Sequence, residues 1–210
     1  MVQSMPERTA PLSDRLEALC REAARVYGIA GLAEASDWLK AEITDVPSGA
    51  LPEHLVADAE RAMAAMPDAG LREAVRACAG DLAWTHGERV LPYGFHRRRC
   101  FVEIAGPDGM GQRDDIRFGL YLQSAGTFYA PHNHEAVEHY LPVSGTALWQ
   151  RGDGAFERRA PGTLITHATY ERHAMRTDAE PLLALWIWTG NIDFATYAVD
   201  AEATEEPATG

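Results

Sequence analysis

The chain has 210 residues and a formal net charge of −12 at pH 7, with 46% hydrophobic and 24% charged residues. Such a composition is ordinary for a globular protein, and the length fits one domain with a helical extension. The negative charge argues against a nucleic-acid partner. We see neither a secretory signal nor an apolar run approaching about 18 residues, so we expect no membrane segment and a cytoplasmic protein.

The residue types available for chemistry are limited. The cysteines Cys20, Cys78 and Cys100 form no C-x-x-C pair, and we interpret them as small buried thiols. Lys40 is the only lysine and lies far from the C-terminal half, which argues against Schiff-base chemistry. No glycine-rich phosphate loop is present. We interpret the one basic run, Arg97 to Arg99, as a solvated turn.

Residues 1–90 predict a helical region that packs on a barrel, after a flexible leader over residues 1–10. Apolar residues recur at helical spacing from Leu12 to Val26, which predicts a helix with Ser13 as its N-cap and an end near Gly28. Similar stripes predict further helices over residues 32–43, 53–66 and 71–82. A homodimer formed through these helices is plausible.

Residues 91–200 predict a barrel of short strands, and the acidic tail 201–210 predicts disorder. Turn signals such as VSG and GDG separate the strands. Regular spacing of this kind is typical of a sandwich or barrel. The predicted strands cover residues 99–104, 116–122, 127–130, 137–143, 146–150, 155–159, 164–166, 182–188 and 194–199.

The most informative stretch runs from Gly126 to Gly145 and reads GTFYAPHNHEAVEHYLPVSG. Its spacing is G-x5-H-x-H-x3-E-x6-G. In an unbroken strand, residues at even spacing share one face. Two imidazoles and a carboxylate that converge suit a divalent transition metal. The ligand candidates are His132, His134 and Glu138, and Tyr140 would share their face.

This spacing resembles the first motif of the cupin superfamily at every fixed position. The resemblance implies a mainly β protein, built on a double-stranded β-helix barrel with an N-terminal α-helical extension. It also implies one more histidine from a second motif, which the segment Pro161 to Thr177 resembles. We favour His173 for this ligand because the Pro-Gly turn and the His-Ala pair align on it. His167 is the alternative and stands where many cupins carry a proline.

A narrower resemblance points to the cupin lyases of dimethylsulfoniopropionate. It is carried by the Tyr-x-Pro-His before the motif, by H-x-H-x3-E-x-Y, and by the later HAMRT and LLALWIW segments. It implies that His134, Glu138, Tyr140 and His173 surround one divalent metal, Zn, Fe, Mn, Co or Ni. His132 is then a further ligand or a close neighbour. Tyr129 matches a second pocket tyrosine used in substrate binding or proton transfer.

The implied reaction fits the residues. A divalent metal can bind the carboxylate of the sulfonium zwitterion, and Tyr140 can remove the adjacent proton as general base. This β-elimination would yield dimethyl sulfide and acrylate. Tyr121, Trp186 and Trp188, together with Tyr129, would form an aromatic wall for the sulfonium. The alternatives are a metal-dependent dioxygenase, a non-catalytic cupin that binds a small ligand, and an isomerase.

Overall fold

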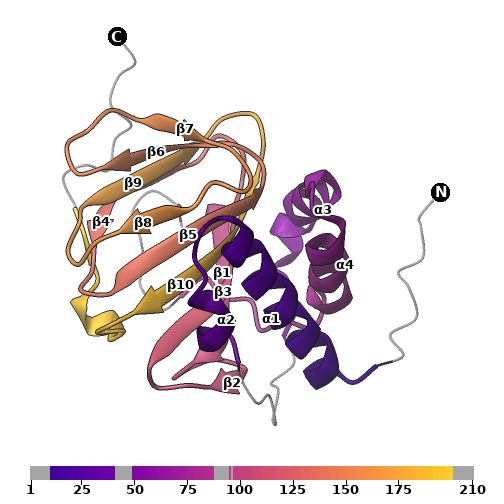
Figure 1. Ribbon diagram of the computed structural model, residues 1–210. Coiled ribbons are helices and arrows are strands. Elements are labelled where there is room, and N and C mark those ends of the chain that lie inside the picture. The colour runs from indigo at the N-terminus through magenta and orange to yellow at the C-terminus, as the bar shows by residue number, and fades with distance from the viewer. Residues whose placement is uncertain (1–9, 41–48, 88–94, 96, 201–210) are drawn as a thin grey trace.

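The computed structural model describes residues 10–40, 49–87, 95 and 97–200, so the predicted tail 201–210 and most of the leader lie outside the described residues. A helical layer comes first, followed by a barrel of strands (Figure 1). The helices are α1 (Leu12–Ile29), α2 (Ala35–Trp38), α3 (Val56–Ala65) and α4 (Ala69–Cys78), with a 3₁₀ turn η1 (Glu53–Leu55) before α3. None of the helices in these ranges combines the length and apolar character needed to cross a bilayer.

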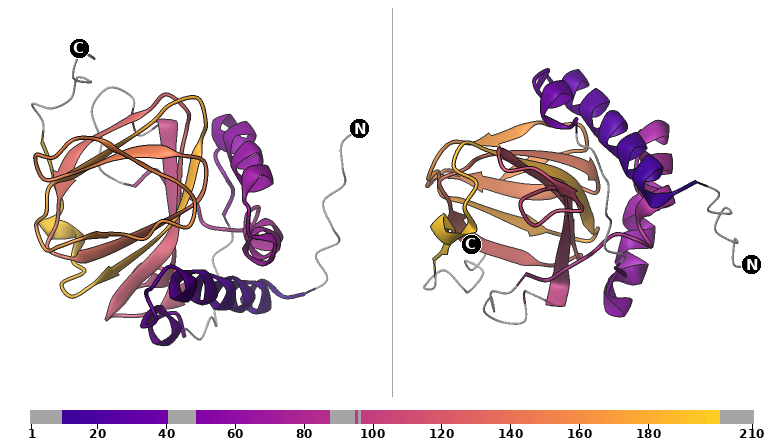
Figure 2. Two further views of the ribbon diagram at one scale, coloured as in Figure 1. Left: turned by 45° about the horizontal axis from the view of Figure 1, so that its top comes forward. Right: turned by 90° about the horizontal axis from the view of Figure 1, so that it is seen from below.

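The strands form two sheets that curve around a common interior, and the helices cover one outer side of the barrel (Figure 2). The larger sheet has the order β2-β1-β3-β10-β5-β8 and the smaller one the order β11-β4-β9-β6-β7. The strands are β1 (Arg99–Gly106), β2 (Gly111–Gln112), β3 (Ile116–Gln123), β4 (Phe128–Asn133), β5 (Val137–Ser144), β6 (Ala147–Arg151), β7 (Glu157–Arg159), β8 (Ile165–His167), β9 (His173–Thr177), β10 (Leu182–Thr189) and β11 (Ala198–Val199). The expected barrel with an N-terminal helical extension is confirmed.

The strands of the larger sheet have two buried faces of different character. Successive side chains of a strand point to opposite faces. On β10, Leu183, Leu185 and Ile187 join the apolar cluster that includes the helices, whereas Trp186 and Trp188 belong to a second cluster inside the barrel. The same alternation runs along β1, β3 and β5. The helical layer therefore covers the outer face, and the inner face is left for the barrel interior.

The helices also contact the strand that carries the central motif. The hydroxyl of Tyr27 on α1 is fully buried and donates a hydrogen bond of 2.9 Å to the carbonyl oxygen of His139 on β5. The Trp38 ring of α2 stacks on the His139 ring with 5.6 Å between centroids. A buried hydrogen bond of this kind contributes about 1 kcal/mol. These contacts brace β5 from the side opposite the barrel interior.

Both glycines that frame the motif have a backbone reason to be glycine. Gly126 and Gly145 adopt φ values of +62° and +73°, in the left-handed region that side chains rarely occupy. At Gly145 a Cβ atom would also lie 2.1 Å from the carbonyl oxygen of Pro181. The framing glycines therefore permit the tight turns that begin β4 and end β5.

Several predicted boundaries are wrong. Ser13 is not the N-cap, because α1 begins at Leu12 after Pro11 and has no side-chain cap. Of the helix predicted over residues 32–43, the described part contains only α2, and residues 41–48 lie outside the described ranges. The fourth helix, predicted to reach residue 82, ends at Cys78. The strand predicted over 194–199 begins as a 3₁₀ turn η3 (Phe194–Thr196), because the Asp193 side chain accepts a hydrogen bond from the Ala195 amide. The short strands β2 and β9 were not predicted.

Candidate active site

A cavity of about 630 Å³ opens inside the barrel, between the two sheets and η3. Ligand sites in proteins commonly have this volume. All the predicted site residues except His173 line it, namely Tyr121, Tyr129, His132, His134, Glu138, Tyr140, Trp186 and Trp188. The interior carries both charged and aromatic side chains, which suits a polar ligand with an apolar part.

The ligand candidates converge for a different reason from the one that the even spacing suggested. The strand is broken, because β4 ends at Asn133 and β5 begins at Val137, so His134 lies in the turn between them. The pairing of β4 with β9 also shifts register between Tyr129 and His132. The condition of an unbroken strand is therefore not met, in keeping with the separate strands predicted over 127–130 and 137–143. The side chains meet because the turn folds β5 back across the barrel.

His132, His134 and His173, which we call the histidine cluster, surround the Glu138 carboxylate. The Glu138 Oε2 atom lies 3.1 Å from His134 Nε2 and 3.1 Å from His173 Nε2. His132 pairs with His173 across β4 and β9, and their ring centroids are 4.1 Å apart. One ligand atom each from His132, Glu138 and His173 lies within 4.8 Å of the others. All four side chains are buried.

Each ring of the histidine cluster is oriented by the backbone. A carbonyl oxygen can only accept, so the Nδ1 atom that contacts it must carry a proton, and Nε2 is the ring nitrogen left to face a metal. Metal-binding histidines are oriented in this manner. The three contacts run from His132 Nδ1 to Ala130 O at 2.9 Å, from His134 Nδ1 to Ala136 O at 3.0 Å, and from His173 Nδ1 to Glu171 O at 2.8 Å.

The electrostatics of the cluster fit a cation. Burial opposes the charge of Glu138, but His134 and His173 outweigh it and hold the pKa of this carboxyl well below its usual range. Burial and the adjacent His173 lower the pKa of His132 well below its ordinary value. The Nε2 atom of His173 is buried and faces Glu138 Oε2 at 3.1 Å without the geometry of a hydrogen bond. Imidazole nitrogens grouped around an ionised carboxylate are the donor set of a divalent transition metal.

His167 lies behind the cluster. Its Nε2 atom accepts a hydrogen bond of 3.1 Å from Trp149 Nε1, which can only donate. Its ring stacks on that of His173, with centroids 3.9 Å apart and an interplanar angle of 9°. Burial, together with His173, lowers the pKa of His167 to about 3. This geometry favours His173 over His167 as the ligand from the second motif.

The tyrosines stand around the cluster. Tyr140 follows Glu138 on β5, and burial together with the Glu138 charge raises its pKa well above the ordinary value. Tyr129 stacks on His132 at 4.0 Å, and its hydroxyl lies 2.5 Å from that of Tyr197. Both Tyr129 and Tyr140 are buried and line the cavity.

The two tryptophans of β10 differ in their polar contacts. The Nε1 atom of Trp188 donates a hydrogen bond of 2.7 Å to Glu138 Oε1. The Nε1 atom of Trp186 is buried without a partner in the described part of the chain. The rings meet edge to face with centroids 6.2 Å apart. Trp188 therefore orients a ligand candidate, whereas Trp186 presents its ring to the cavity.

Arg99 and Tyr197 are among the cavity-wall residues that sequence reasoning missed. The solvated turn predicted for Arg97 to Arg99 is wrong at Arg99, which opens β1 and is only 7% exposed. The strand alternation that places Phe101 and Glu103 on the cavity side extends back to Arg99 and is the signal that could have found it. Tyr197 follows η3, where a strand had been predicted.

Comparison with known proteins finds similarity to dimethylsulfoniopropionate lyases. A family model described as dimethylsulfoniopropionate lyase matches residues 21–184. The dimethylsulfoniopropionate lyase DddQ of Ruegeria pomeroyi is 28% identical over 130 residues, which cover 60% of this chain and 64% of that relative. The chain thus matches less than two thirds of the length of this curated relative.

Two solved structures share the fold over almost the whole chain. One is described as belonging to the DMSP lyases RdDddP and RnDddQII, with a TM-score of 0.74 and 26% identity over 90% of this chain and 100% of that one. The other is DMSP lyase DddQ from Ruegeria pomeroyi, with a TM-score of 0.69 and 22% identity over 92% of this chain and 99% of that one. The cupin-type barrel with its helical layer is therefore shared with both.

Proposed function

Because the chain belongs to the dimethylsulfoniopropionate lyase family, we propose that it cleaves dimethylsulfoniopropionate to dimethyl sulfide and acrylate in this cavity. The observation that carries the proposal is the convergence of the histidine cluster and Glu138, with Tyr140 beside them on the cavity wall. The substrate is a small sulfonium zwitterion. The cavity places charged groups together and surrounds them with aromatic rings, which suits both the carboxylate and the sulfonium of this substrate.

The metal ligands in this proposal are His132, His134, Glu138 and His173. His132, Glu138 and His173 are mutually close, and His134 Nε2 contacts the same Glu138 oxygen as His173. Mixed nitrogen and oxygen donors suit Zn, Fe, Mn, Co or Ni. When bound, such an ion supplies a Lewis acid that holds the substrate carboxylate and makes the adjacent α-proton more acidic.

Tyr140 is the proposed general base. Without a cation, burial and Glu138 keep its hydroxyl protonated, as the raised pKa shows. A divalent ion held by the histidine cluster and Glu138 would act in the opposite direction and favour the phenolate. The phenolate then accepts the α-proton, a double bond forms between the α and β carbons, and the β-carbon–sulfur bond breaks. The electron pair leaves with sulfur, so dimethyl sulfide departs neutral and requires no proton.

The aromatic side chains provide the binding surface for the sulfonium. A cation over an aromatic face gains about 2 kcal/mol when both are desolvated. Trp186, Tyr121 and Trp188 are buried at the cavity wall, and Tyr129 lies beside Tyr121 at 6.1 Å between centroids. Tyr129 is held through its hydroxyl contact with Tyr197. We assign Tyr129 to substrate binding or to relaying the proton that Tyr140 accepts.

The test is anaerobic incubation of the metal-reconstituted protein with dimethylsulfoniopropionate, in which dimethyl sulfide and acrylate are measured together. We expect equimolar release that a chelator abolishes and that needs no oxygen. Tyr140→Phe should lower kcat by at least about 100-fold, the range of general-base catalysis, while metal content stays the same. The matched control is Tyr170→Phe, since Tyr170 is 54% exposed and absent from the cavity wall. Near wild-type turnover in Tyr140→Phe would exclude Tyr140 as the base.

A further inference from the structure

Arg99 is a buried cation at the wall of the cavity. It is the first residue of β1, it is 7% exposed, and its side chain lines the cavity together with Phe101 and Glu103. Its Nε atom is buried without a hydrogen-bond partner among the described residues. A guanidinium has five N–H donors and keeps its charge at any physiological pH. A buried charge that is neither paired nor hydrogen-bonded is costly, so such a group calls for a ligand.

The acidic side chains that share the cavity are already engaged. Glu103 pairs with Arg117 at 2.6 Å, and Asp108 pairs with the same Arg117 nitrogen at 2.8 Å. Glu138 is held within the histidine cluster. None of these three carboxylates neutralises Arg99. In a chain with a net charge of −12, this cavity therefore holds a guanidinium that none of the cavity carboxylates in the described part of the chain neutralises.

Aromatic rings hold the guanidinium in place without satisfying its donors. The Cζ atom of Arg99 lies 5.1 Å from the Phe95 ring centroid, 5.6 Å from that of Phe101 and 5.5 Å from that of Tyr129. Rings attract a guanidinium through their faces, whereas its N–H donors point outward in its own plane. A carboxylate accepts two such donors side by side. The rings therefore position Arg99 for an anion.

The position of Arg99 suits the carboxylate end of the substrate. Tyr129 stacks on His132 at 4.0 Å and also lies 5.5 Å from Arg99 Cζ, so the same ring contacts both the histidine cluster and the guanidinium. We propose that Arg99 binds the carboxylate of the substrate, an inference that rests on the proposed function of this site. Removal of the α-proton shifts further negative charge onto that carboxylate, which a second cation besides the metal stabilises.

The test compares a small acid with its neutral amide, because Arg99 should distinguish them. Binding of 3-(methylthio)propanoate and 3-(methylthio)propanamide is measured by calorimetry on the metal-loaded protein and again after chelation. We expect Arg99→Met to lower the affinity for the acid by about 30-fold or more. The affinity for the amide and the metal content should stay unchanged. After chelation the wild type should still prefer the acid, and the variant should not. Arg99→Lys should fall between the two.

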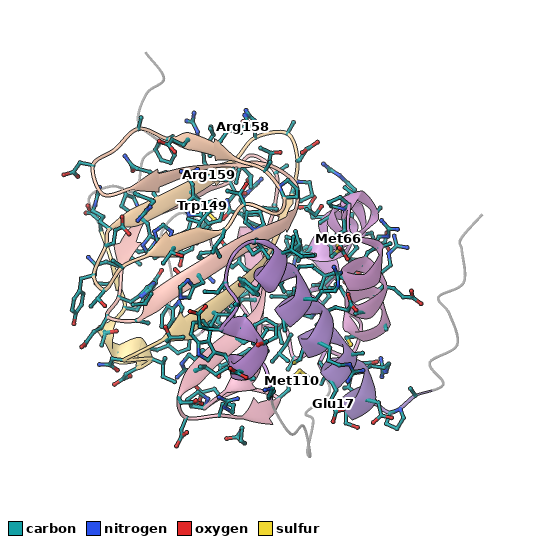
Figure 3. The ribbon with its side chains drawn as sticks, viewed as in Figure 1. Glu17, Met66, Met110, Trp149, Arg158 and Arg159 are labelled. Atoms are coloured by element: carbon teal, nitrogen blue, oxygen red, sulfur yellow. The ribbon has the colours of Figure 1, made fainter. Side chains whose placement is uncertain are left out.

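Arg158→Met is the matched control. Arg158 lies on β7 at the outer edge of the smaller sheet (Figure 3), pairs with Asp178 and is 63% exposed. We expect the ratio of acid to amide affinity in Arg158→Met to equal that of the wild type. The unliganded Arg99→Met protein should melt no lower than the wild type, because the substitution removes a buried unpaired charge. If the variant melts lower and keeps the acid preference, Arg99 is a structural residue and the inference is wrong.

The outcome is separable from that of the proposed function. If the wild type binds the acid through Arg99 but releases no dimethyl sulfide, the anion site stands and the lyase assignment fails. If turnover is normal and Arg99→Met leaves KM, kcat and acid binding unchanged, the lyase stands and the anion site fails. If Arg99→Met does not fold, the acid-to-amide ratio of Arg99→Lys decides, and a wild-type ratio in that variant overturns the inference.

Discussion

The hydrogen bond from Trp188 to Glu138 makes a sharp test of the metal site. Substitution of Trp188 by phenylalanine keeps an aromatic ring in β10 but removes the Nε1 donor that lies 2.7 Å from Glu138 Oε1. A hydrogen bond to a charged group contributes about 1.5–3 kcal/mol. Loss of an outer partner of a metal ligand typically costs about 10–100-fold in metal affinity. The two estimates agree, since each factor of ten corresponds to about 1.4 kcal/mol.

Trp186→Phe is the matched control for this prediction. Both tryptophans lie on the same strand and line the same cavity, but the Trp186 Nε1 atom has no partner among the described residues. We expect Trp188→Phe to weaken metal binding within the stated range, as measured by competition with a chromophoric chelator. Trp186→Phe should leave metal affinity unchanged and raise KM. Equal metal affinity in the two variants would refute the role of this hydrogen bond.

Two further predictions concern stability. Tyr27→Phe should lower the free energy of unfolding by about 1–2 kcal/mol in urea titrations, because it removes the buried hydrogen bond to the His139 carbonyl; the same loss in the exposed control Tyr170→Phe would contradict it. The metal-free protein should lose stability as the pH falls below about 6.5, the value for histidine in an unfolded chain. The pKa of His167 is about 3 in the folded protein, so the unfolded chain takes up this proton first. The loss at pH 5 is about 2 kcal/mol for this side chain alone, and equal urea midpoints at pH 7.5 and 5 would contradict the prediction.

Local patterns were enough to find the ligand candidates and the helices. His132, His134 and Glu138 lie together although the strand between them is broken, because a tight turn also brings residues at this spacing close to one another. The apolar stripe of α1 depends only on residues that are close in sequence. The framing glycines Gly126 and Gly145 are likewise explained by their own backbone angles.

The missed features depend on pairing between distant segments. The strand β9 is short, mixes polar and apolar residues, and is recognisable only through its pairs with β4 and β6. Arg99 belongs to a basic run, and although the predicted strand 99–104 begins there, nothing in that run shows that its third member is buried. Tyr197 enters the cavity because the turn at Asp193 places it next to Tyr129. Such placements are tertiary effects that single-sequence patterns do not contain.

Strands that are buried on both faces explain how the barrel interior can hold so many polar groups. A buried carboxylate, several histidines and an arginine inside one barrel oppose folding. On β10 and β1, however, every second side chain points outward into an apolar cluster with α1, α3 and α4. Burial of that outer face supplies hydrophobic stabilisation that is independent of the interior. Loss of the helices would therefore expose Leu185, Ile187 and Val102 and destabilise the strands that position the site, without touching any residue that lines the cavity.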